Sequence, residues 1–300
     1  MPARWFSCPA GVVEIEECLT QCPISEQLPA GRCLSLRTLR SISHQREWKG
    51  KPSTTQLIKG TREAYLEIVT DYAVDPQDRL FMVHGSRGHG YLEQFVGTNE
   101  LSEERLHDLI SSGMFDFYDP ESESLFDSKF WGSYKVNKAL GRYQKEVETG
   151  EYYKRDGKNA KKGDPKTRME WFEGGVRHVF SEAIQLNDYR IKLEEVLPEG
   201  YQVKSMFIEA LVRDGGLMVA GMRDIRQNGV LIPVNRISDH RIRKYMAKKA
   251  ERLHHALETG ETPNRCNKRE SWSGRKCEKY CNVREACAKV ESEKREEVAV

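Results

Sequence analysis

The amino-acid sequence predicts an α/β protein in which helices flank a mixed central sheet. Three observations lead to this prediction. Hydrophobic residues make up 38% of the 300 residues and charged residues 31%, which is typical of a globular chain with a sizeable core. Segments with the two-residue alternation of strands are interspersed with segments of helical period. The eight cysteines lie only near the two chain ends, so we expect cysteine-rich segments 1–45 and 259–300 around a core of residues 46–258.

The first elements expected in chain order are helices separated by irregular chain. The N-terminal cysteine-rich segment has little periodic structure, whereas residues 61–69 have the apolar spacing of a helix. Residues 80–83 form a short apolar run, which is followed by a segment broken by glycines. Ser102 is expected to cap a helix over 103–110, because its hydroxyl can accept a hydrogen bond from a free N–H of the first turn.

Residues 114–118 and 125–130 are predicted to form a β-hairpin. Both runs are short and apolar, and Asp119-Pro120-Glu121-Ser122 between them contains the residue types that favour turns. Neighbouring strands of a sheet lie about 4.8 Å apart. Side chains on the same face of these two strands are therefore expected to lie close enough to share a ligand.

The second half of the chain is predicted to add helices and further strands. Residues 169–193 have amphipathic helical spacing, although a Gly-Gly pair can divide this helix in two. Residues 203–212 and 217–222 flank an Asp-Gly-Gly turn and are expected to pair as a second hairpin. The last predicted elements of the core are a strand over 230–237 and a basic helix over 239–257.

The charge of the whole chain does not indicate a nucleic-acid-binding protein, because the net charge is only +2. The segment 154–168 differs from the rest, since it combines many Lys and Arg residues with Gly and Pro and few apolar side chains. It is predicted to be a flexible basic loop, either a solvated insertion or a contact for phosphates. The loop cations with a candidate nucleic-acid-binding role are Lys154, Arg155, Lys158, Lys161 and Lys162.

Acidic residues on the first predicted hairpin suggest hydrolysis of phosphodiesters, which commonly uses Mg²⁺ or Mn²⁺ held by carboxylates. Asp116 and Asp127 fall on the two strands, and Lys129 points to the same face as Asp127 because side chains alternate along a strand. The pattern Asp-x-Lys is weak by itself, since residues 156–158 and 164–166 match it too. Only the copy at 127–129 lies in an apolar strand with a second carboxylate on its hairpin partner.

Two further motifs surround this pair in an order that resembles a known family. Upstream lies a G-x3-H-x3-E pattern that ends in His89 and Glu93, and downstream lies Gln185 with Tyr189 four residues on. The ordered set, over about residues 85–190, resembles the RecB-like branch of the PD-(D/E)XK nucleases. That branch includes the nuclease domains of RecB and AddB and the CRISPR-associated RecB-like nucleases. The resemblance implies a restriction-endonuclease-like core.

By this resemblance the chain is a metal-dependent DNA nuclease, with an exonuclease of recombination, repair, phage replication or CRISPR adaptation expected first. Glu93 would orient Lys129 or a water, and Arg190 would lie near the DNA backbone. Gln185 and Tyr189 would steady the site and the substrate, and Lys129 would be the active-site lysine. The implied ligands of Mg²⁺ or Mn²⁺ are His89, Asp116, Asp127 and the main-chain carbonyl of Ser128.

The cysteines are expected to bind metal, because clustered cysteines in a cytosolic chain indicate ligation more often than disulfides. Either each end closes a four-cysteine site, or Cys33 joins three C-terminal cysteines around one cluster, as the RecB-like resemblance implies. Two sites use all eight thiols. The first group is Cys8, Cys18, Cys22 and Cys33, for which zinc is expected. The second group is Cys266, Cys277, Cys281 and Cys287, for which a [4Fe–4S] cluster or zinc is expected.

A second hypothesis is a non-catalytic nucleic-acid-binding protein that uses the basic loop together with structural zinc or iron–sulfur sites. A third is a regulatory cluster protein in which the nuclease core only serves as a scaffold. The expected partner is DNA, single- or double-stranded, with a homo-oligomer or a recombination protein as a further partner. No apolar run predicts a membrane span or a secretory signal, so we expect the cytoplasm of a bacterial or phage-infected cell.

Overall fold

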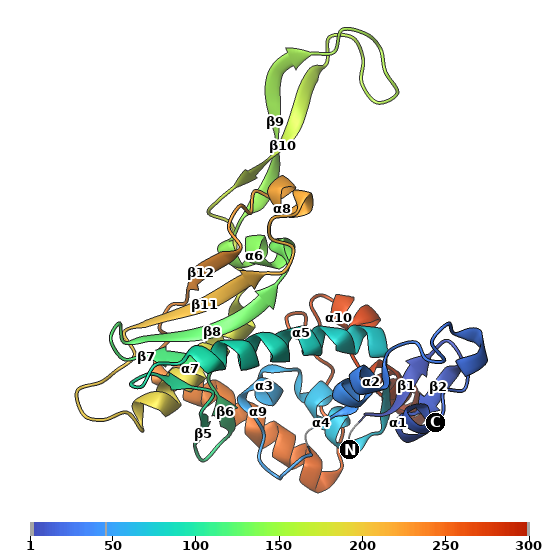
Figure 1. Cartoon of the computed structure of the whole chain (residues 1–300), viewed down its shortest axis with the longest axis vertical. Coiled ribbons are helices and arrows are strands. Elements are labelled where there is room, and N and C mark those ends of the chain that lie inside the picture. The colour runs from blue at the N-terminus through green and yellow to red at the C-terminus, as the bar shows by residue number, and fades with distance from the viewer. Residues whose placement is uncertain (1–2, 46, 299–300) are drawn as a thin grey trace.

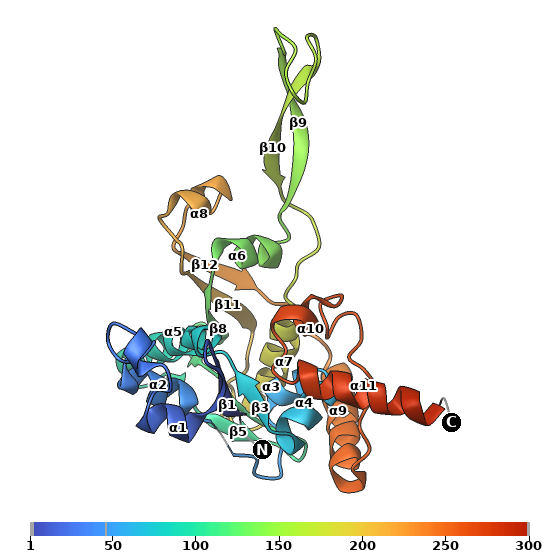
Figure 2. The same cartoon turned by 90° about the vertical axis from the view of Figure 1, so that its right-hand side faces the viewer.

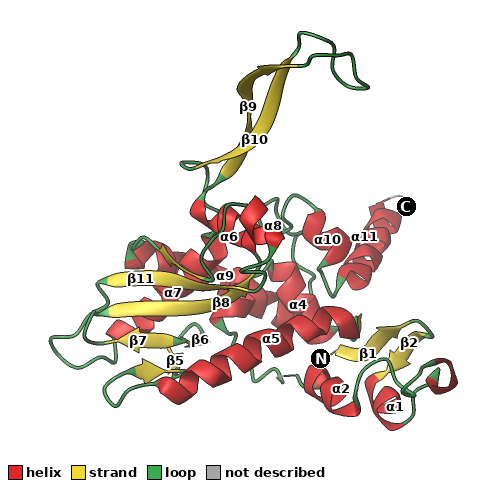
Figure 3. Cartoon of the chain, turned by 45° about the horizontal axis from the view of Figure 1, so that its top comes forward, coloured by secondary structure: helices red, strands yellow, loops and turns green. Residues whose placement is uncertain are grey.

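The computed structural model describes residues 3–45 and 47–298 and has a mixed α/β fold, as predicted. Figure 1 and Figure 3 show a mixed sheet with helices on both of its sides. In this sheet β11 and β8 are parallel, while the other neighbouring strands are antiparallel. In spatial order the strands are β12 (Gly229–Pro233), β11 (Ser205–Val212), β8 (Ser124–Trp131), β7 (Phe117–Asp119) and β4 (Leu101–Ser102).

Two helices cover opposite faces of β8. On one face, Leu186 and Leu193 of α7 (Phe180–Glu194) are buried in the same cluster as the strand residue Leu125. On the other face, α5 (Pro76–Leu92) crosses the strand at Phe130, against which Gly88 packs so closely that a Cβ there would overlap the ring. A side chain at position 88 would therefore push the helix off the sheet.

A second helical layer lies outside α7. Its members bury a cluster that includes Leu57, Leu66, Met246 and Leu253, and burial of this kind is worth roughly 1.5–3 kcal/mol per large aliphatic side chain. The helices of this layer are α3 (Thr54–Ile58), α4 (Thr61–Val69) and α9 (Asp239–Thr259). Two short helices, α6 (Ser133–Leu140) and α8 (Met218–Met222), lie between the central sheet and the hairpin formed by residues 143–172 (Figure 1).

The N-terminal segment is joined to the body through a small sheet. Strand β1 (Ala3–Cys8) pairs with β2 (Gly11–Glu14) and, in parallel, with β3 (Tyr72–Val74). Phe6 and Ile42 are fully buried beside Val74 in the cluster that this sheet forms. The remaining elements of the segment are α1 (Ile15–Thr20), the 3-10 turn η1 (Ser25–Gln27) and α2 (Leu36–Ser43).

The C-terminal segment packs on α4 at another side of the molecule. It contains α10 (Arg275–Lys279) and α11 (Arg284–Val298), and an ion pair of 2.6 Å joins Lys276 Nζ to Glu63 of α4. Figure 2 shows the N-terminal helices and the C-terminal helices on opposite sides of the body. The two cysteine-rich ends are therefore separate in space.

Two further hairpins complete the described chain. The small one consists of β5 (Arg105–His107) and β6 (Ser112–Met114). The large one consists of β9 (Tyr143–Tyr152) and β10 (Pro165–Phe172), and it projects from the body as a two-stranded arm (Figure 1). A final 3-10 turn, η2 (Glu93–Phe95), follows α5 directly.

Several predicted elements are confirmed. Helix α4 has the expected bounds, and α9 extends the helix predicted at 239–257 by two residues. The hairpin predicted around residues 119–122 is formed by β7 and β8, although its first strand is shorter than expected. Residues 112–114 belong to β6 instead, so Asp116 lies just before β7. The strand expected at 230–237 is β12, which ends at Pro233.

The glycine-broken segment after residue 83 is not a break, because α5 runs through it. Asp75 caps this helix by accepting a hydrogen bond from Gln77 N at 2.7 Å, and Pro76 occupies its first position. Packing on β8 outweighs the low helix propensity of the glycines, which is about 1 kcal/mol per residue. The helix predicted over 103–110 is absent, since Glu103 has a φ of 51° and 105–107 form β5.

Two predictions in the second half of the chain are also wrong. The helix expected over 169–193 begins only at Phe180, because 165–172 pair with β9 as the strand β10. The hairpin partner expected at 217–222 is the helix α8, and β11 pairs with β12 instead. In both cases the apolar spacing does not distinguish a helix from a strand, so the tertiary contacts decide which of the two forms.

Candidate metal centre

A group of polar side chains lies where the end of α5, the start of β7 and the middle of β8 meet. Asp127 and Lys129 project from β8 toward α7, because alternate residues of a strand share a face. Asp116 lies directly before β7, and His89 lies in the last turn of α5. Three segments thus contribute to the group. Asp116 comes from the chain before β7, Asp127 from β8 and the imidazole of His89 from α5.

Asp127 has the most unusual environment of these residues. Its side chain is 1% exposed, and its Oδ1 accepts a hydrogen bond from Lys129 Nζ at 2.6 Å. Its Oδ2 is buried and has no hydrogen-bond partner among the described residues. An unsatisfied buried oxygen of a carboxylate is costly, by about 1–3 kcal/mol or more, unless a cation or donor supplies the missing interaction. This orphaned oxygen fits a metal ligand.

Asp116 is held beside Asp127 by the main chain of β8. Its Oδ2 accepts a hydrogen bond from Ser128 N at 2.7 Å. Burial raises the pKa of Asp116 to about 7, and the neighbouring charge of Asp127 contributes in the same direction. A carboxyl group whose ionised form is disfavoured by a neighbouring carboxylate in this way is suited to binding a divalent cation, whose charge offsets that repulsion.

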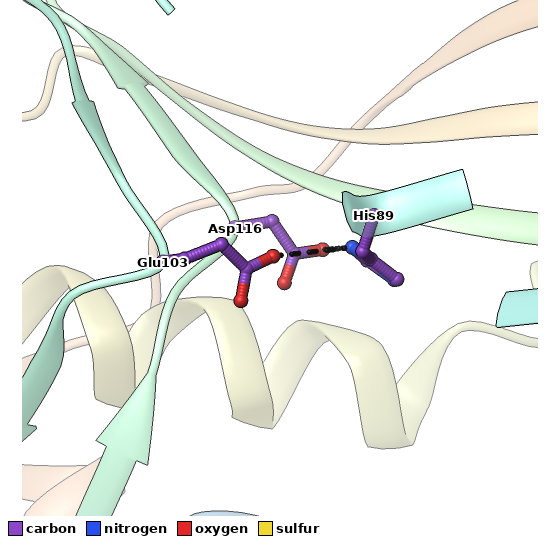
Figure 4. Close-up of side chains that lie close together, drawn as sticks. All are labelled: His89, Glu103 and Asp116. Carbon is purple, nitrogen blue, oxygen red and sulfur yellow. Dashed lines mark ion pairs between the residues drawn. The ribbon is translucent and has the colours of Figure 1, made fainter. Parts of the chain in front are cut away.

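His89 and Glu103 complete the group at its exposed side. His89 Nδ1 lies 3.4 Å from Glu103 Oε1 and 3.7 Å from Asp116 Oδ2. Figure 4 shows the three side chains pointing toward one another from three separate segments. The hydrogen bond to Glu103 raises the pKa of His89, and the charge of Asp116 raises it further. Within the described residues, His89, Glu103 and Asp116 are the one set of three metal-ligating side chains whose ligand atoms lie within 4.8 Å.

Lys129 is half-buried between the acids and α7. Burial lowers the pKa of Lys129, but the attraction of Asp127 and Asp116 outweighs this effect, and the pKa lies above its usual value. For Tyr189, by contrast, burial raises the pKa to about 12. Its hydroxyl accepts a hydrogen bond from Gln185 Nε2 at 3.0 Å. The amine is therefore a fixed positive charge, and the phenol is a neutral donor at neutral pH.

The structure brings together seven of the residues that the sequence predicted for the site. These residues are His89, Asp116, Asp127, Ser128, Lys129, Gln185 and Tyr189. Ser128 contributes its N–H to Asp116, and its hydroxyl donates to Glu209 Oε2 at 2.7 Å. A metal contact through the Ser128 carbonyl stays a prediction.

Glu93 is not brought to this group. It begins the 3-10 turn η2, its side chain is exposed, and it forms no ion pair or hydrogen bond with the group in the described part of the chain. Glu103 lies beside His89 instead. The sequence analysis missed it, because Ser102-Glu103 was interpreted as the start of a helix. Ser102 in fact donates its hydroxyl to the carbonyl of Asp116 at 2.8 Å.

The prediction that Arg190 lies near DNA is corrected by its burial. Its side chain is fully buried, and it forms ion pairs with Glu194 at 2.9 Å and with Asp239 at 2.7 Å. It also donates to the carbonyl of Ile237 at 3.1 Å. Arg190 therefore joins α7 to the start of α9 and has no exposed surface for a phosphate.

The four N-terminal thiols lie near one another. Burial raises the pKa of Cys18, and Cys33, Cys22 and Cys8 raise it further, in that order among the thiols. Cys33 is thus placed with the N-terminal thiols, in the segment whose helices α1 and α2 lie on the opposite side of the body from α10 and α11 (Figure 2). No three of the described sulfurs lie within 4.8 Å of one another, so zinc at this end stays a prediction.

The C-terminal thiols have fewer neighbouring thiols than Cys18 has in the N-terminal group. Cys266 and Cys281 each lie near Cys277, and burial raises the pKa of Cys281 to about 11. Cys287 accepts a hydrogen bond from Arg62 at 3.6 Å. Cys277 lies in α10 and Cys287 in α11, and a cluster or zinc at these four residues stays a prediction.

Comparison of the chain with protein-family models gives no match, and comparison with curated proteins gives none either. None of the helices described for this chain has the length and apolar character that crossing a bilayer requires.

Proposed function

We propose that the chain is a metal-dependent DNA nuclease with a RecB-like PD-(D/E)XK site. The observation that carries the proposal is the buried Asp127 carboxylate, which has one oxygen on Lys129 and the other without a partner. The order of His89, Asp116, Asp127 and Lys129 along the chain also matches the motif order of that branch. An exonuclease of recombination, repair, phage replication or CRISPR adaptation, acting in the cytoplasm of a bacterial or phage-infected cell, is the form we favour.

The residues that would hold Mg²⁺ or Mn²⁺ are His89, Asp116 and Asp127, with Glu103 in place of a water or as a further ligand. His89, Glu103 and Asp116 have ligand atoms within 4.8 Å of one another, and together with the unpartnered Asp127 Oδ2 such oxygen and imidazole donors suit hard divalent cations, Mn²⁺ in particular. When bound, the cation supplies Lewis-acid stabilisation of the phosphate charge and a more acidic water. Because Asp116 has a pKa of about 7, a part of its population must lose a proton before it can act as a ligand.

The residues of the chain account for the rest of the proposed chemistry. Lys129 is a permanent positive charge beside Asp127, so it can offset negative charge that develops on the phosphate. Tyr189 is a neutral donor that Gln185 holds in place from the same helix face. Because Asp127 keeps Lys129 in position before the substrate arrives, little reorganisation is needed during the reaction.

The test is degradation of linear single- and double-stranded DNA by purified protein with Mg²⁺ or Mn²⁺. Asp127→Asn is the inactive comparison, and Asp78→Asn is the matched control, since Asp78 is exposed on α5 and its replacement changes the net charge equally. We expect cleavage by the wild type and by Asp78→Asn alone. Equal rates for the wild type and Asp127→Asn would contradict the proposal and leave the non-catalytic nucleic-acid-binding protein as the better hypothesis.

We further propose structural zinc at Cys8, Cys18, Cys22 and Cys33. For Cys266, Cys277, Cys281 and Cys287 the proposal is a [4Fe–4S] cluster or zinc. Such sites stabilise short irregular segments that bury little core. Metal analysis and absorbance near 400 nm distinguish cluster from zinc, since zinc thiolates do not absorb there.

A further inference from the structure

The β9–β10 arm has no core of its own and no covering element. Of the ten residues of β9 only Val147 is partly buried, and both faces of the ribbon are exposed over most of its length. A two-stranded hairpin of this kind is at best marginally stable by itself in water. Its base is fixed to the body, because Trp171 Nε1 donates to the carbonyl of Met222 in α8 at 3.1 Å, and the two strands are joined there by the Tyr143 ring, which stacks on Phe172.

The charge of the arm is concentrated at its tip, which consists of residues 153–164. The tip carries five cations and only two aspartates: Lys154, Arg155, Lys158, Lys161, Lys162, Asp156 and Asp164. Both aspartates are occupied by main-chain N–H groups of the loop, Asp156 by Lys162 N at 2.8 Å and Asp164 by Lys161 N at 2.6 Å. The acids thus hold the loop together, and with five cations against two aspartates the tip keeps a net charge of +3.

The cations of the tip and of the stem differ in their partners. Of the three stem cations, Lys166 pairs with Glu151 at 2.8 Å and Arg168 with Glu170 at 2.5 Å, while Lys145 forms no ion pair with a described residue. At the tip, all five cations are exposed, and none forms an ion pair with a described residue. A group of unpaired cations on a protruding loop is complementary to a polyanion, because each phosphate contact releases a condensed counterion.

The stem gives the tip a fixed reach. Ten residues of β-strand span about 33 Å, which corresponds to roughly ten base pairs of duplex at 3.4 Å per base pair. The stem also carries Glu146, Glu148, Glu151 and Glu170, which disfavour contact with the DNA backbone along its length. Duplex DNA is stiff over about 150 base pairs, so it presents phosphates at a defined distance to such a spacer.

We infer that the arm is a docking element for duplex DNA, in which the stem is a spacer about one helical turn long and the tip contacts the phosphate backbone beyond it, away from the metal centre (Figure 1). The inference rests on the proposed function in naming DNA as the polyanion and a duplex as the form bound. It adds a second contact that the metal centre does not need for chemistry. Tip contacts of this kind increase affinity without reading sequence.

The test is binding of labelled 30-base-pair and 8-base-pair duplexes by the full chain, without added Mg²⁺ or Mn²⁺, over 50–300 mM salt. One variant replaces Lys158, Lys161 and Lys162 with Gln. The matched control replaces three exposed cations of α9 with Gln, which changes the net charge equally at the opposite end of the molecule from the arm (Figure 1). The control residues are Lys244, Lys248 and Arg252.

For the 30-base-pair duplex we expect the tip variant to bind at least about tenfold more weakly at 100 mM salt, with a salt slope shallower by about 2–3. The α9 control should bind like the wild type, and the 8-base-pair duplex should not distinguish the three proteins. Equal losses in both variants would show a net-charge effect and overturn the inference. It would also be overturned by an equal loss on both duplexes, by unchanged binding, or by a change in oligomeric state caused by the tip substitutions.

Binding and cleavage separate this inference from the proposed function. If the wild type never cleaves DNA but the tip variant still loses affinity, the docking arm stands and the nuclease does not. If the wild type cleaves DNA and the tip substitutions change neither binding nor cleavage, the nuclease stands and the docking arm does not.

Discussion

The pattern Asp-x-Lys occurs in two contrasting regions of this molecule. On β8, Asp127 is buried, it pairs with Lys129, and one of its oxygens has no partner among the described residues. In the arm tip, Asp156 is exposed and accepts a hydrogen bond from a loop N–H, while Lys158 forms no ion pair with a described residue. The same residue types therefore make a buried carboxylate with one unpartnered oxygen in one place, and in the other a hydrogen bond within a loop beside an exposed cation.

The difference shows that burial and neighbours decide what a short motif can do. A carboxylate in water is well solvated and gains little from a distant cation. A carboxylate enclosed by a sheet and a helix keeps its charge only if other groups compensate for the lost water. On β8 the compensation is incomplete, and this is the property that suits a metal ligand.

The largest contrast is expected for removal of the two aspartate charges. Asp127→Asn should slow cleavage at saturating DNA by on the order of 10³-fold, because a lost ligand removes several kcal/mol of stabilisation from the transition state. Asp156→Asn should leave that rate within about threefold, since a surface substitution rarely changes the body of a protein. Release of acid-soluble nucleotides from linear DNA measures both rates.

Comparable losses in these two variants would break the comparison between the regions. Circular dichroism of Asp127→Asn checks that its fold is retained. A loss of secondary structure would move the test to Asp127→Glu, which keeps the charge and displaces it by one methylene.

The second contrast concerns the two lysines. Lys129→Met should reduce the cleavage rate by about 10²-fold, as expected for loss of one charge at the developing anion. It should also lower the free energy of unfolding by about 3–5 kcal/mol, because Asp127 would remain buried without its partner. Lys158→Met should change neither quantity, and it should weaken only the binding of long duplexes.

Lys129→Arg distinguishes charge from shape in this experiment. The substitution keeps the cation, so we expect stability close to that of the wild type together with reduced cleavage. Denaturant unfolding gives the stability and the nuclease assay gives the rate. If Lys129→Met cleaves DNA at the rate of the wild type, Lys129 has no role in the mechanism.

A smaller contrast is expected between two glutamates near His89. Glu103→Gln should raise the Mn²⁺ concentration needed for half-maximal cleavage by about 10–100-fold. This is the range typical for groups that orient or supplement metal ligands. Glu93→Gln should have no such effect, since Glu93 is exposed and forms no contact with the group among the described residues. Titration of cleavage with Mn²⁺ measures the effect. The reverse result would restore the role that the sequence motif implies for Glu93.

The sequence predicted the acids on β8 and before β7 because short-range alternation and turn chemistry define that hairpin. Asp127 and Lys129 share a face by strand geometry alone. The position of Glu103 could not be predicted in this way, since its φ of 51° places it in a turn, and nothing in its neighbours requires that turn. Its contact with His89 depends on how α5 crosses the sheet.

The arm was missed for a related physical reason. The segment 154–168 has the composition of a loop, and the flanking strands β9 and β10 are exposed on both faces, so they lack the alternation that identifies a strand. Conversely, Arg190 was expected near DNA because of its place beside Tyr189. A helix turns by about 100° per residue, and this rotation directs Arg190 toward Ile237 and Asp239 at the start of α9, away from the face that carries Tyr189.

The smallest expected effect concerns the stability of the metal centre without its cation. Burial raises the pKa of Asp116 from 3.8 to about 7, so the folded state binds this proton more tightly than the unfolded state. The resulting stabilisation is fully present below the unfolded pKa, and it is lost as the pH rises through about 7. Above pH 7 the folded wild type therefore carries an ionised Asp116 that destabilises it.

Asp116→Asn removes this charge and still accepts the hydrogen bond from Ser128 N. Without divalent cations at pH 8 it should raise the unfolding midpoint by about 2–4 °C, from a gain of roughly 1–2 kcal/mol. At pH 5 the gain should be smaller, and it should vanish only as the pH falls below about 3.8, where Asp116 is protonated in the folded and the unfolded chain alike. Asp78→Asn should give no gain at either pH. Added Mn²⁺ should stabilise only the wild type, so that at pH 8 its unfolding midpoint becomes higher than that of Asp116→Asn. If Asp116→Asn keeps the higher midpoint with Mn²⁺, Asp116 is not a ligand.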